Sequence, residues 1–381
     1  MRYEVAVIGL GGMGAAGLAH IASRGVSVIG LERFERLHQK GASTGESRII
    51  RKAYFENPAY VPMLERAYEL WAELEAQSGR QLVDFVGILM VGTPDREGIA
   101  GTLRTAREYD LPLEEFDAAQ IARRFPGTLP RRDEVGLLEH KAGIVFPESA
   151  LDAHLTVAAA HGAEMRFNTR VESFDKRDGV HILTLDDGTT VEAGRLAICP
   201  GMWAQQVLAD LKLPLRVQRN VQIWFEPVNA HFDHGVFPTF FLERADLPAP
   251  LYGFPAINGA LKAALHKFGT FVDPEKVERR IHDDDATIVG GALEDWLEGA
   301  AGSYLRGRVC PYTLTPDGNF IIDKHPNDPT ITIACGFSGH GYKFCPVVGE
   351  IVADLTIDGG TRHPIGFLGI NRFSQSSMRV I

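Results

Sequence analysis

The first thirty-two residues constrain the fold more than any other segment of the chain. An apolar run, Val5 to Ile8, leads into Gly9-Leu10-Gly11-Gly12-Met13-Gly14, and a helical stretch follows from Ala15 to about Ser23. A second apolar run, Val26 to Leu31, ends at Glu32. This order of strand, glycine-rich turn, helix and strand is typical of a βαβ unit that binds a dinucleotide.

Each glycine of this motif, and Glu32 after it, has a physical role. Gly9 permits the tight turn, Gly11 lets a pyrophosphate approach the backbone, and Gly14 lets the helix pack closely on the strand. The helix N-terminus offers unpaired N–H groups to the phosphates. Glu32 lies where a carboxylate can accept hydrogen bonds from a ribose diol. The alternative interpretation is a glycine-rich turn in an unrelated α/β fold.

Composition excludes several other classes of protein. With 45% apolar and 23% charged residues over 381 positions, the chain is of globular type. A net charge of −10 disfavours nucleic acid as a partner. The four cysteines form no Cys-x-x-Cys pair, so neither a disulfide framework nor structural zinc is indicated. We find no apolar run of about 20 residues and no signal-peptide pattern, so we expect a cytoplasmic protein without a membrane span.

The rest of the chain divides into two kinds of segment. We expect helices over 59–78 and 151–161, strands over 164–171 and 181–185 with a turn at Asp186-Asp187-Gly188, and a buried strand over 195–199. Residues 215–310 alternate aromatic and apolar runs with Pro- and Gly-rich turns, which is typical of an antiparallel sheet. A strand over 330–334, a glycine-rich turn and a helix over 347–355 then form a second dinucleotide-type unit.

These segments predict an α/β (α+β) fold with a discontinuous nucleotide domain. The Rossmann-like domain is expected to comprise residues 1–82, 143–215 and 315–373, and a second domain, built on a mainly antiparallel sheet, residues 83–142 and 216–314. Residues 374–381 are expected to form a loose tail.

Several motifs, in the same order along the chain, resemble the monomeric sarcosine oxidase family, which includes N-methyltryptophan and pipecolate oxidases. They are Gly9 to Gly14 with Glu32, Gly45 to Arg51, Tyr252 to Pro255 with Lys262, Cys310-Pro311-Tyr312 with Phe320 to Asp323, and Gly336 to Phe344. The resemblance implies an FAD-binding domain, a substrate domain and a monomeric enzyme.

The resemblance also implies which residues contact FAD. They are Gly9, Gly11, Gly14, Glu32, Ser43, Thr44, Val171, Gly201, Cys310, Gly339, His340, Gly341 and Lys343. Cys310 matches the family cysteine that is joined to the flavin through a thioether. The alternative for Cys310 is an inert buried cysteine, which suits Cys199, Cys335 and Cys345 better, and Cys345 is the second candidate for attachment. Ser43-Thr44 stands where many members of the family have one or two histidines.

Arg48 and Arg51 would share one face if their loop leads into a helix, and two cations so close repel each other unless an anion is near. The alternative is a pair of solvated arginines. By resemblance, Arg48 lies near the flavin ring, whereas Arg51 and Lys343 bind the substrate carboxylate, with Tyr312 beside it. A guanidinium suits this task because two N–H groups meet two oxygens.

Lys262 lies in an apolar run, Asn258 to His266, where a lysine is costly unless it reaches solvent or has a task. By resemblance it lies near the flavin and stabilises the superoxide that forms when O₂ is reduced. The alternative is a solvent-exposed lysine on an edge strand. Tyr252 and His266 are assigned to the same catalytic pocket by resemblance, and for His266 a core or rim histidine is the alternative.

The expected function is that of an FAD-dependent oxidase of secondary N-alkyl amino acids, which reduces O₂ to H₂O₂. A flavin dehydrogenase of the same substrates, or an oxidase of a cyclic or bulkier amine such as pipecolate or N-methyltryptophan, is the alternative. An NAD-dependent dehydrogenase and a non-catalytic flavin protein fit the later motifs less well. No metal is expected, because His231-Phe232-Asp233-His234 and His282-Asp283-Asp284-Asp285 lie in turn-like sequence without a third cluster of ligands.

Overall fold

The N-terminal βαβ unit forms as the sequence predicts. In the computed structural model, which describes residues 2–373, it consists of β1 (Arg2–Ile8), α1 (Gly12–Ser23) and β2 (Val28–Leu31), and β1 pairs with β2 in parallel. The predicted tail, 374–381, lies outside the described residues. Side chains along β1 alternate between the two faces of the sheet, and Val5, Ala6 and Val7 are all fully buried, so both faces of this strand are covered.

The first sheet assembles strands from distant parts of the chain. Its parallel core contains β9 (Glu164–Arg166), β2, β1, β12 (Thr190–Ile198) and β20 (Asp328–Cys335), in that order. Antiparallel β10 (Val171–Arg177), β11 (Val180–Leu185) and β19 (Ile321–His325) complete the eight strands among the described residues. The pairing of β12 with β20 brings the C-terminal unit beside the N-terminal one, so the first sheet is discontinuous in sequence.

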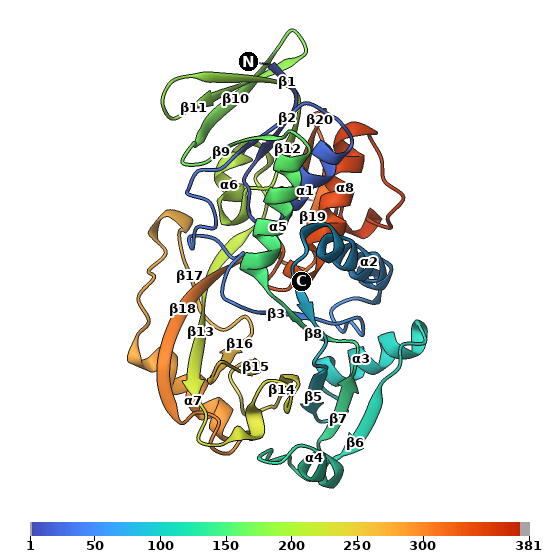
Figure 1. The fold of residues 1–381 in the computed structure, drawn as a ribbon, viewed down its shortest axis with the longest axis vertical. Helices are drawn as coiled ribbons and strands as arrows, with labels where there is room; N and C mark the ends of the chain where they lie inside the picture. Colours follow the sequence, from blue (N-terminus) through green and yellow to red (C-terminus); the bar gives the residue numbers. More distant parts are fainter. Residues whose placement is uncertain (1, 374–381) are drawn as a thin grey trace.

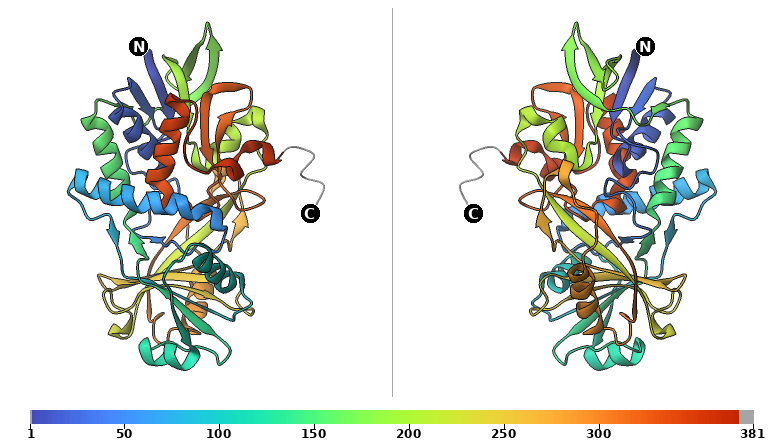
Figure 2. Two further views of the ribbon diagram at one scale, coloured as in Figure 1. Left: turned by 90° about the vertical axis from the view of Figure 1, so that its right-hand side faces the viewer. Right: turned by 90° about the vertical axis from the view of Figure 1, so that its left-hand side faces the viewer.

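Helices cover one face of this sheet. They are α1, α2 (Val61–Ser78), α5 (Pro147–Ala160) and α8 (Cys345–Ile357). In Figure 2, α1, α5 and α8 lie side by side and α2 runs across below them. Helices α1 and α8 pack closely, because Gly349 has no side chain and a Cβ there would lie 2.6 Å from the Ala16 Cβ. The opposite face is covered by residues around the short helix α6 (Ala204–Val207), where Leu208 is fully buried.

A second sheet forms the other half of the molecule and lies at the bottom of Figure 1. Its nine described strands are β5 (Ile88–Gly92), β6 (Glu114–Asp117), β7 (Val135–Glu139), β13 (Arg216–Glu226), β14 (Thr239–Glu243), β15 (Leu251–Ile257), β16 (Ala260–Leu265), β17 (Thr270–Phe271) and β18 (Ser303–Leu314). All their pairings are antiparallel except β5 with β14. This sheet is therefore mainly antiparallel, as predicted.

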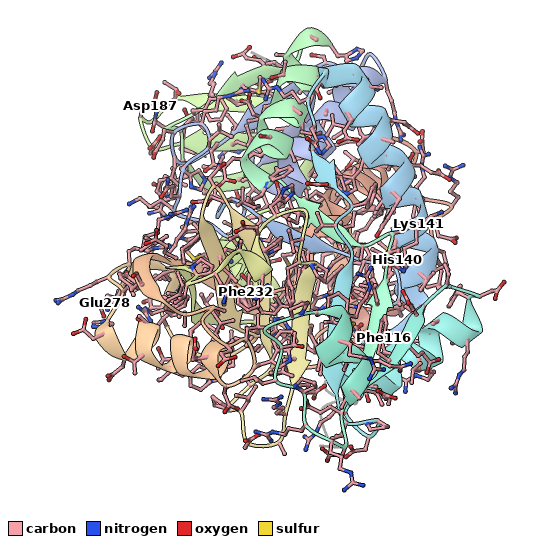
Figure 3. All side chains as sticks on the ribbon, turned by 60° about the horizontal axis from the view of Figure 1, so that its bottom comes forward. Phe116, His140, Lys141, Asp187, Phe232 and Glu278 are labelled. Carbon is pink, nitrogen blue, oxygen red and sulfur yellow. The ribbon has the colours of Figure 1, made fainter. Side chains whose placement is uncertain are left out.

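Helices α3 (Glu97–Glu108), α4 (Ala118–Arg124) and α7 (Asp283–Glu294) pack around the second sheet. In Figure 3, Phe232 lies among the side chains of this half, whereas Asp187 and Glu278 lie at the periphery of the molecule. Phe232 is fully buried and packs edge-on against Phe237. The core of the second half is therefore a separate aromatic-rich cluster.

A small third sheet of β3 (Arg48–Ile50), β8 (Gly143–Val145) and β4 (Val83–Asp84) lies between the two halves. The expected helical face shared by Arg48 and Arg51 is therefore wrong, because Arg48 begins a strand that pairs with Val145. The predicted strand over 164–171 is also wrong in extent: it divides into β9 and β10, which pair with different neighbours.

The predicted fold class is confirmed, whereas the exact domain boundaries stay a prediction. The helix predicted over 59–78 is α2, which ends at Gly79 with a left-handed φ of 66°. Turn Asp186-Asp187-Gly188 joins β11 to β12 as expected. Within residues 2–373, no helix is both long and apolar enough to cross a membrane.

Candidate functional site

A cleft of about 740 Å³ extends between the two sheets. At one end it is lined by the glycine-rich turn, Glu32, Val171 and Gly201. At the other end, here called the substrate end, it is lined by Ile49, Arg51, Phe55, Glu56, Ile88, Phe241, Tyr252, Phe254, His266, Tyr312, His340 and Lys343.

The glycine-rich turn leaves room only for backbone. Gly9 has a φ of 87°, and a Cβ there would lie 2.4 Å from the carbonyl oxygen of Cys199. At Gly14 a Cβ would lie 1.8 Å from the Gly9 carbonyl oxygen, so α1 packs directly on the turn. Gly11 precedes the helix and lines the cleft, where its missing side chain lets a phosphate approach the first N–H groups of α1.

Glu32 is held rigidly at the end of β2. Its carboxylate accepts hydrogen bonds from the backbone N–H groups of Leu10 at 2.7 Å and Phe34 at 3.1 Å. The residue is only 6% exposed, yet it lines the cleft. A fixed carboxylate beside a phosphate-binding turn fits the ribose of a dinucleotide.

The loop between Ala42 and Arg48 separates the dinucleotide end from the second sheet. Ser43 lines the cleft and accepts a hydrogen bond from the N–H of Gly12 at 2.9 Å. Thr44 is buried and does not line the cleft, and its hydroxyl accepts a hydrogen bond from Arg308. Arg48 lines the cleft, and its guanidinium donates to the carbonyl oxygens of Ala42 at 2.9 Å and Ser47 at 2.8 Å.

Cys310 lies on β18 and lines the cleft, 3.5 Å from the Arg48 Nη2. None of the four cysteines is in a disulfide. Burial raises the pKa of the Cys199 thiol to about 12 and also raises the pKa values of Cys335 and Cys345. Among the four, Cys310 is the one with a guanidinium within hydrogen-bonding distance.

The C-terminal glycine-rich turn, Gly336 to Gly341, packs against Tyr312. Gly339 has a φ of 80°, and a Cβ there would lie 2.4 Å from the Tyr312 ring. The ring of His340 contacts the Tyr54 hydroxyl through Nδ1 and the Gly318 carbonyl oxygen through Nε2 at 2.9 Å. Both ring nitrogens are thus engaged within the protein, and the backbone N–H of His340 donates to the Phe337 carbonyl oxygen at 3.1 Å.

Arg51 is a buried cation that already has a carboxylate partner. Its Nη2 lies 2.6 Å from the Oε2 of Glu56, and its Nη1 donates to the Ala53 carbonyl oxygen at 2.7 Å. Burial alone would raise the pKa of Glu56, but Arg51 and, less strongly, Lys343 lower it to about 2. Glu56 was not among the residues expected from the sequence; an acid five positions after Arg51 was the available signal.

Lys343 is a second cation at this end of the cleft. Its Nζ donates to the His340 carbonyl oxygen at 2.8 Å and lies 5.0 Å from the centre of the Tyr54 ring. Burial, together with Arg51, lowers its pKa to about 7. Arg51 and Lys343 both lie beside the Tyr54 ring, 4.5 and 5.0 Å from its centre, although among the described residues no hydrogen bond joins their side chains to a common group.

Two tyrosines and a histidine complete the substrate end. The hydroxyl oxygens of Tyr252 and Tyr312 lie 3.2 Å apart, and the ring of His266 lies 6.2 Å from Tyr252 and 5.9 Å from Tyr312. Burial raises the pKa values of both tyrosines and lowers that of His266 well below its usual value. All three side chains are neutral near pH 7.

Lys262 is buried at 2% exposure and lies in β16, between β13 and β15, so it is not an edge-strand lysine. Its Nζ donates to the carbonyl oxygens of Gly45 at 2.8 Å and Ser47 at 2.7 Å. It lies behind the Arg48 loop and does not line the cleft. Burial, and then the charge of Arg48, lower its pKa well below the usual value.

The two histidine-rich segments have structural roles. The backbone N–H of His231 donates to Asn229, and Asp285 accepts from the N–H of His282 while pairing with Arg219 at 2.8 Å. Within the described part of the chain, no group of three potential metal ligands comes together.

Comparison with known proteins places this geometry in a family. The model of the family of FAD dependent oxidoreductases named DAO matches residues 4–355. The monomeric sarcosine oxidase of Streptomyces avermitilis is 45% identical over 386 aligned positions, covering 98% of each chain. The monomeric sarcosine oxidase of a Bacillus strain is 36% identical (97% of this chain, 96% of the relative), and an N-methyl-L-tryptophan oxidase of Yersinia pestis is 31% identical (98% and 100%).

Solved structures share the fold. NikD, an amino acid oxidase of nikkomycin biosynthesis, superposes with a TM-score of 0.86 at 24% identity over 97% of each chain. L-Proline dehydrogenase from P. horikoshii gives 0.83 at 21% identity over 99% of each chain. The cradle of Gly9 to Gly14 and the fixed Glu32 fit the dinucleotide that the family binds. By its sequence over residues 4–355 and by its fold, this chain belongs to the DAO family of FAD-dependent oxidoreductases.

Proposed function

We propose that this protein is an FAD-dependent oxidase of secondary N-alkyl amino acids. The observation that carries the proposal is the pair of buried cations, Arg51 and Lys343, at the end of a cleft that begins at a dinucleotide cradle. FAD, when bound, would supply the redox chemistry, in which a hydride equivalent leaves the C–H beside the amine and two electrons are passed on to O₂. The relatives named as sarcosine and N-methyltryptophan oxidases support this substrate class.

Arg51 and Lys343 would bind and orient the substrate carboxylate. The substrate carboxylate would take the place of Glu56, whose Oε2 now lies 2.6 Å from Arg51. Two cations near the amine also disfavour an ammonium group, because like charges repel in a site with little water. The bound amine is thereby kept neutral, which is the form whose C–N bond can be oxidised.

Neutral aromatic groups would enclose the reacting carbon. Tyr252, Tyr312 and His266 carry no charge near pH 7, and Phe55 and Phe241 lie 5.2 Å apart between ring centres at the same end of the cleft. Such walls exclude water while the imine forms, and water hydrolyses the imine after release.

Lys262 and Cys310 would act on the flavin side. A cation at Lys262 would stabilise the negative charge that builds on O₂, and Cys310, which lies beside Arg48, would form the thioether to FAD. The proposal of covalent attachment rests on the family motif and on the 3.5 Å contact between Arg48 and Cys310. The monomeric state and the cytoplasmic location stay predictions from the sequence.

One observation favours a second candidate, a flavin dehydrogenase of the same substrates. Lys262 Nζ already bonds two carbonyl oxygens and its pKa is lowered, so its charge is less available to oxygen than the oxidase proposal requires. A dehydrogenase would pass its electrons to another carrier and would not need this cation.

The test is peroxide formation by the purified holoenzyme with a panel of N-methyl amino acids and matched N-methylamines that lack the carboxylate. The oxidase proposal expects H₂O₂ in proportion to amine consumed, and much higher kcat/KM for the carboxylated members. Reduction of an artificial acceptor without peroxide would instead support the dehydrogenase, and no reaction with any secondary amine would contradict both.

A further inference from the structure

A tyrosine that the proposed reaction does not use lies beside the two cations of the substrate end. Tyr54 is fully buried, and it is not among the residues that line the cleft. The Cζ of Arg51 lies over its ring, 4.5 Å from the ring centre, and the Nζ of Lys343 lies over the same ring at 5.0 Å. Both cations of the proposed carboxylate site therefore share one aromatic ring.

A shared ring offsets part of the repulsion between two buried cations. Arg51 and Lys343 are each 5% exposed, so little water screens their charges from each other. Glu56 pairs with Arg51, whereas no ion pair joins Lys343 to an acidic side chain within residues 2–373. The face of an aromatic ring carries partial negative charge, and it attracts a cation most strongly where the cation has lost its water. The Tyr54 ring is placed to supply this attraction to both.

The ring of Tyr54 is fixed from several sides. Its backbone carbonyl oxygen accepts a hydrogen bond from the Thr105 hydroxyl at 3.0 Å, which ties the residue to α3. The rings of Tyr60 and Phe344 pack edge-on against it, with 5.3 and 5.4 Å between ring centres. Its hydroxyl contacts the Nδ1 of His340. Tyr54 therefore has little freedom to turn away from the cations.

The direction of the hydrogen bond between Tyr54 and His340 follows from the other ring nitrogen. Burial lowers the pKa of His340 to about 3, so its ring is neutral near pH 7 and carries one proton. The Nε2 lies 2.9 Å from the Gly318 carbonyl oxygen, which can only accept, so the proton is on Nε2. The Nδ1 is then an acceptor, and the Tyr54 hydroxyl donates to it. The C-terminal glycine-rich turn thereby holds the ring in place.

We propose that Tyr54 is a positioning residue for the substrate carboxylate, because its ring holds the side-chain cations of Arg51 and Lys343 in position for one carboxylate. The inference rests on the proposed function and deepens it, since Tyr54 lies outside the lining of the cleft and acts through the two cations. A site whose cations are already arranged loses less free energy to ordering when a carboxylate binds.

The test measures the Kd of (methylthio)acetate, a thioether with one carboxylate and no amine, through the absorbance of bound flavin in the holoenzyme. Tyr54→Met removes the ring and leaves a flexible apolar side chain in its place. We expect a Kd that is higher by about fivefold or more, the size of one buried cation–π contact. Tyr54→Phe keeps the ring and loses the hydroxyl, so its Kd should rise about threefold at most.

Tyr60→Met is the matched control. Tyr60 is also fully buried and packs in the same aromatic cluster, but among the described residues no cation lies over its ring. Each replacement removes one buried tyrosine ring, so each should lower the melting temperature, whereas Tyr54→Met alone should bind the carboxylate weakly. An unchanged Kd in Tyr54→Met, or an equal rise in Tyr60→Met, would overturn the proposal.

A fluorinated ring tests the same contact without removing any packing. Tyr54→Phe is prepared with ordinary and with trifluorinated phenylalanine, which have nearly the same shape. Fluorine withdraws negative charge from the face of the ring and weakens its attraction for a cation. The Kd should be higher for the fluorinated protein, and equal values would overturn the proposal even if Tyr54→Met does not fold.

The pH profile of binding gives a readout that a purely structural role would not move. The charged and titratable groups that act on the Lys343 ammonium are Arg51, Glu56 and His340. Burial and Arg51 lower the pKa of Lys343 to about 7, and loss of the ring removes a further support of its charged form. The rise of Kd with pH should therefore begin about one pH unit lower in Tyr54→Met than in the wild type and the control.

The outcomes separate this inference from the proposed function. A wild-type holoenzyme that binds no carboxylate would contradict the proposed function, and this inference with it. Tight binding by the wild type, with the same Kd and the same pH profile in Tyr54→Met, would overturn this inference alone. Weaker binding and an earlier rise of Kd in Tyr54→Met would support it, whether or not a secondary amine is oxidised.

Discussion

Replacing Glu56 by Gln should tighten the binding of carboxylates to the cleft. The Arg51–Glu56 pair is 2.6 Å long, and the two side chains are only 6% and 14% exposed. A shift of the pKa of Glu56 from 4.5 to about 2 corresponds to roughly 3 kcal/mol in favour of its charged form. An incoming carboxylate must therefore displace a partner that Arg51 holds strongly.

Gln keeps the size of Glu and one hydrogen bond but removes the competing charge. A charge-assisted hydrogen bond is worth about 1.5–3 kcal/mol and a neutral one about 1 kcal/mol. The difference, about 0.5–2 kcal/mol, predicts that (methylthio)acetate, a thioether that carries one carboxylate, binds with a Kd roughly two- to thirtyfold lower in Glu56→Gln. Titration of the bound flavin's absorbance at neutral pH measures this Kd directly.

The stability of the two proteins should also differ with pH. The folded-state pKa of Glu56 is depressed, so its contribution to stability is present above about pH 4.5 and is lost as the pH falls toward 2. Glu56→Gln should lack this loss. Glu69→Gln is the control, because Glu69 forms an ion pair with Arg66 at 2.8 Å on the exposed surface of α2. Unchanged or weaker carboxylate binding in Glu56→Gln would refute the competition, and would indicate that Glu56 positions Arg51 instead.

Three further predictions concern the two ends of the cleft. Arg51→Ala should raise KM for carboxylated amines about ten- to a hundredfold, and far more than for carboxylate-free amines, because a charge-assisted pair is lost; equal losses in steady-state assays would place Arg51 away from the carboxylate. Cys310→Ser should release its flavin on acid denaturation while the wild-type flavin stays with the chain, and flavin retained by the variant would exclude the thioether at this position. The Kd of methylthioacetate should rise as the pH increases through about 7, because Lys343 then loses its proton, and Lys343→Gln should abolish that rise; a flat wild-type profile would contradict the assignment.

Local motifs predicted the nucleotide half of the molecule well, because each requirement of the turn falls within a few residues. A Cβ at Gly14 would clash with the Gly9 carbonyl oxygen, and both residues belong to one βαβ unit. The spacing of the glycines in the sequence is therefore enough to predict this close contact. Long helices such as α2 are equally predictable from the sequence, because apolar residues recur at helical spacing over the whole length of the helix.

The substrate end was less predictable, because its contacts join residues far apart in the chain. The hydrogen-bond partners of Lys262 are the carbonyl oxygens of Gly45 and Ser47, more than two hundred positions earlier, and the local sequence does not indicate them. The engagement of His340 by Tyr54 and Gly318 depends on tertiary packing in the same way. The helical face expected for Arg48 and Arg51 was wrong because pairing with β8 overrides the local pattern.

The most direct test of the oxidase proposal is a double-mixing experiment on the holoenzyme. Flavin is first reduced by an N-methyl amino acid without oxygen and then mixed with O₂ while its absorbance is followed. We predict rapid reoxidation with H₂O₂ formed in equal amount, and reoxidation slower by about 10²–10³ in Lys262→Met, which removes the charge that stabilises reduced oxygen. Lys262→Gln, which keeps donors for the Gly45 and Ser47 carbonyl oxygens, separates loss of charge from loss of folding. A reduced enzyme that stays reduced in O₂ but is reoxidised by an artificial acceptor would contradict the oxidase.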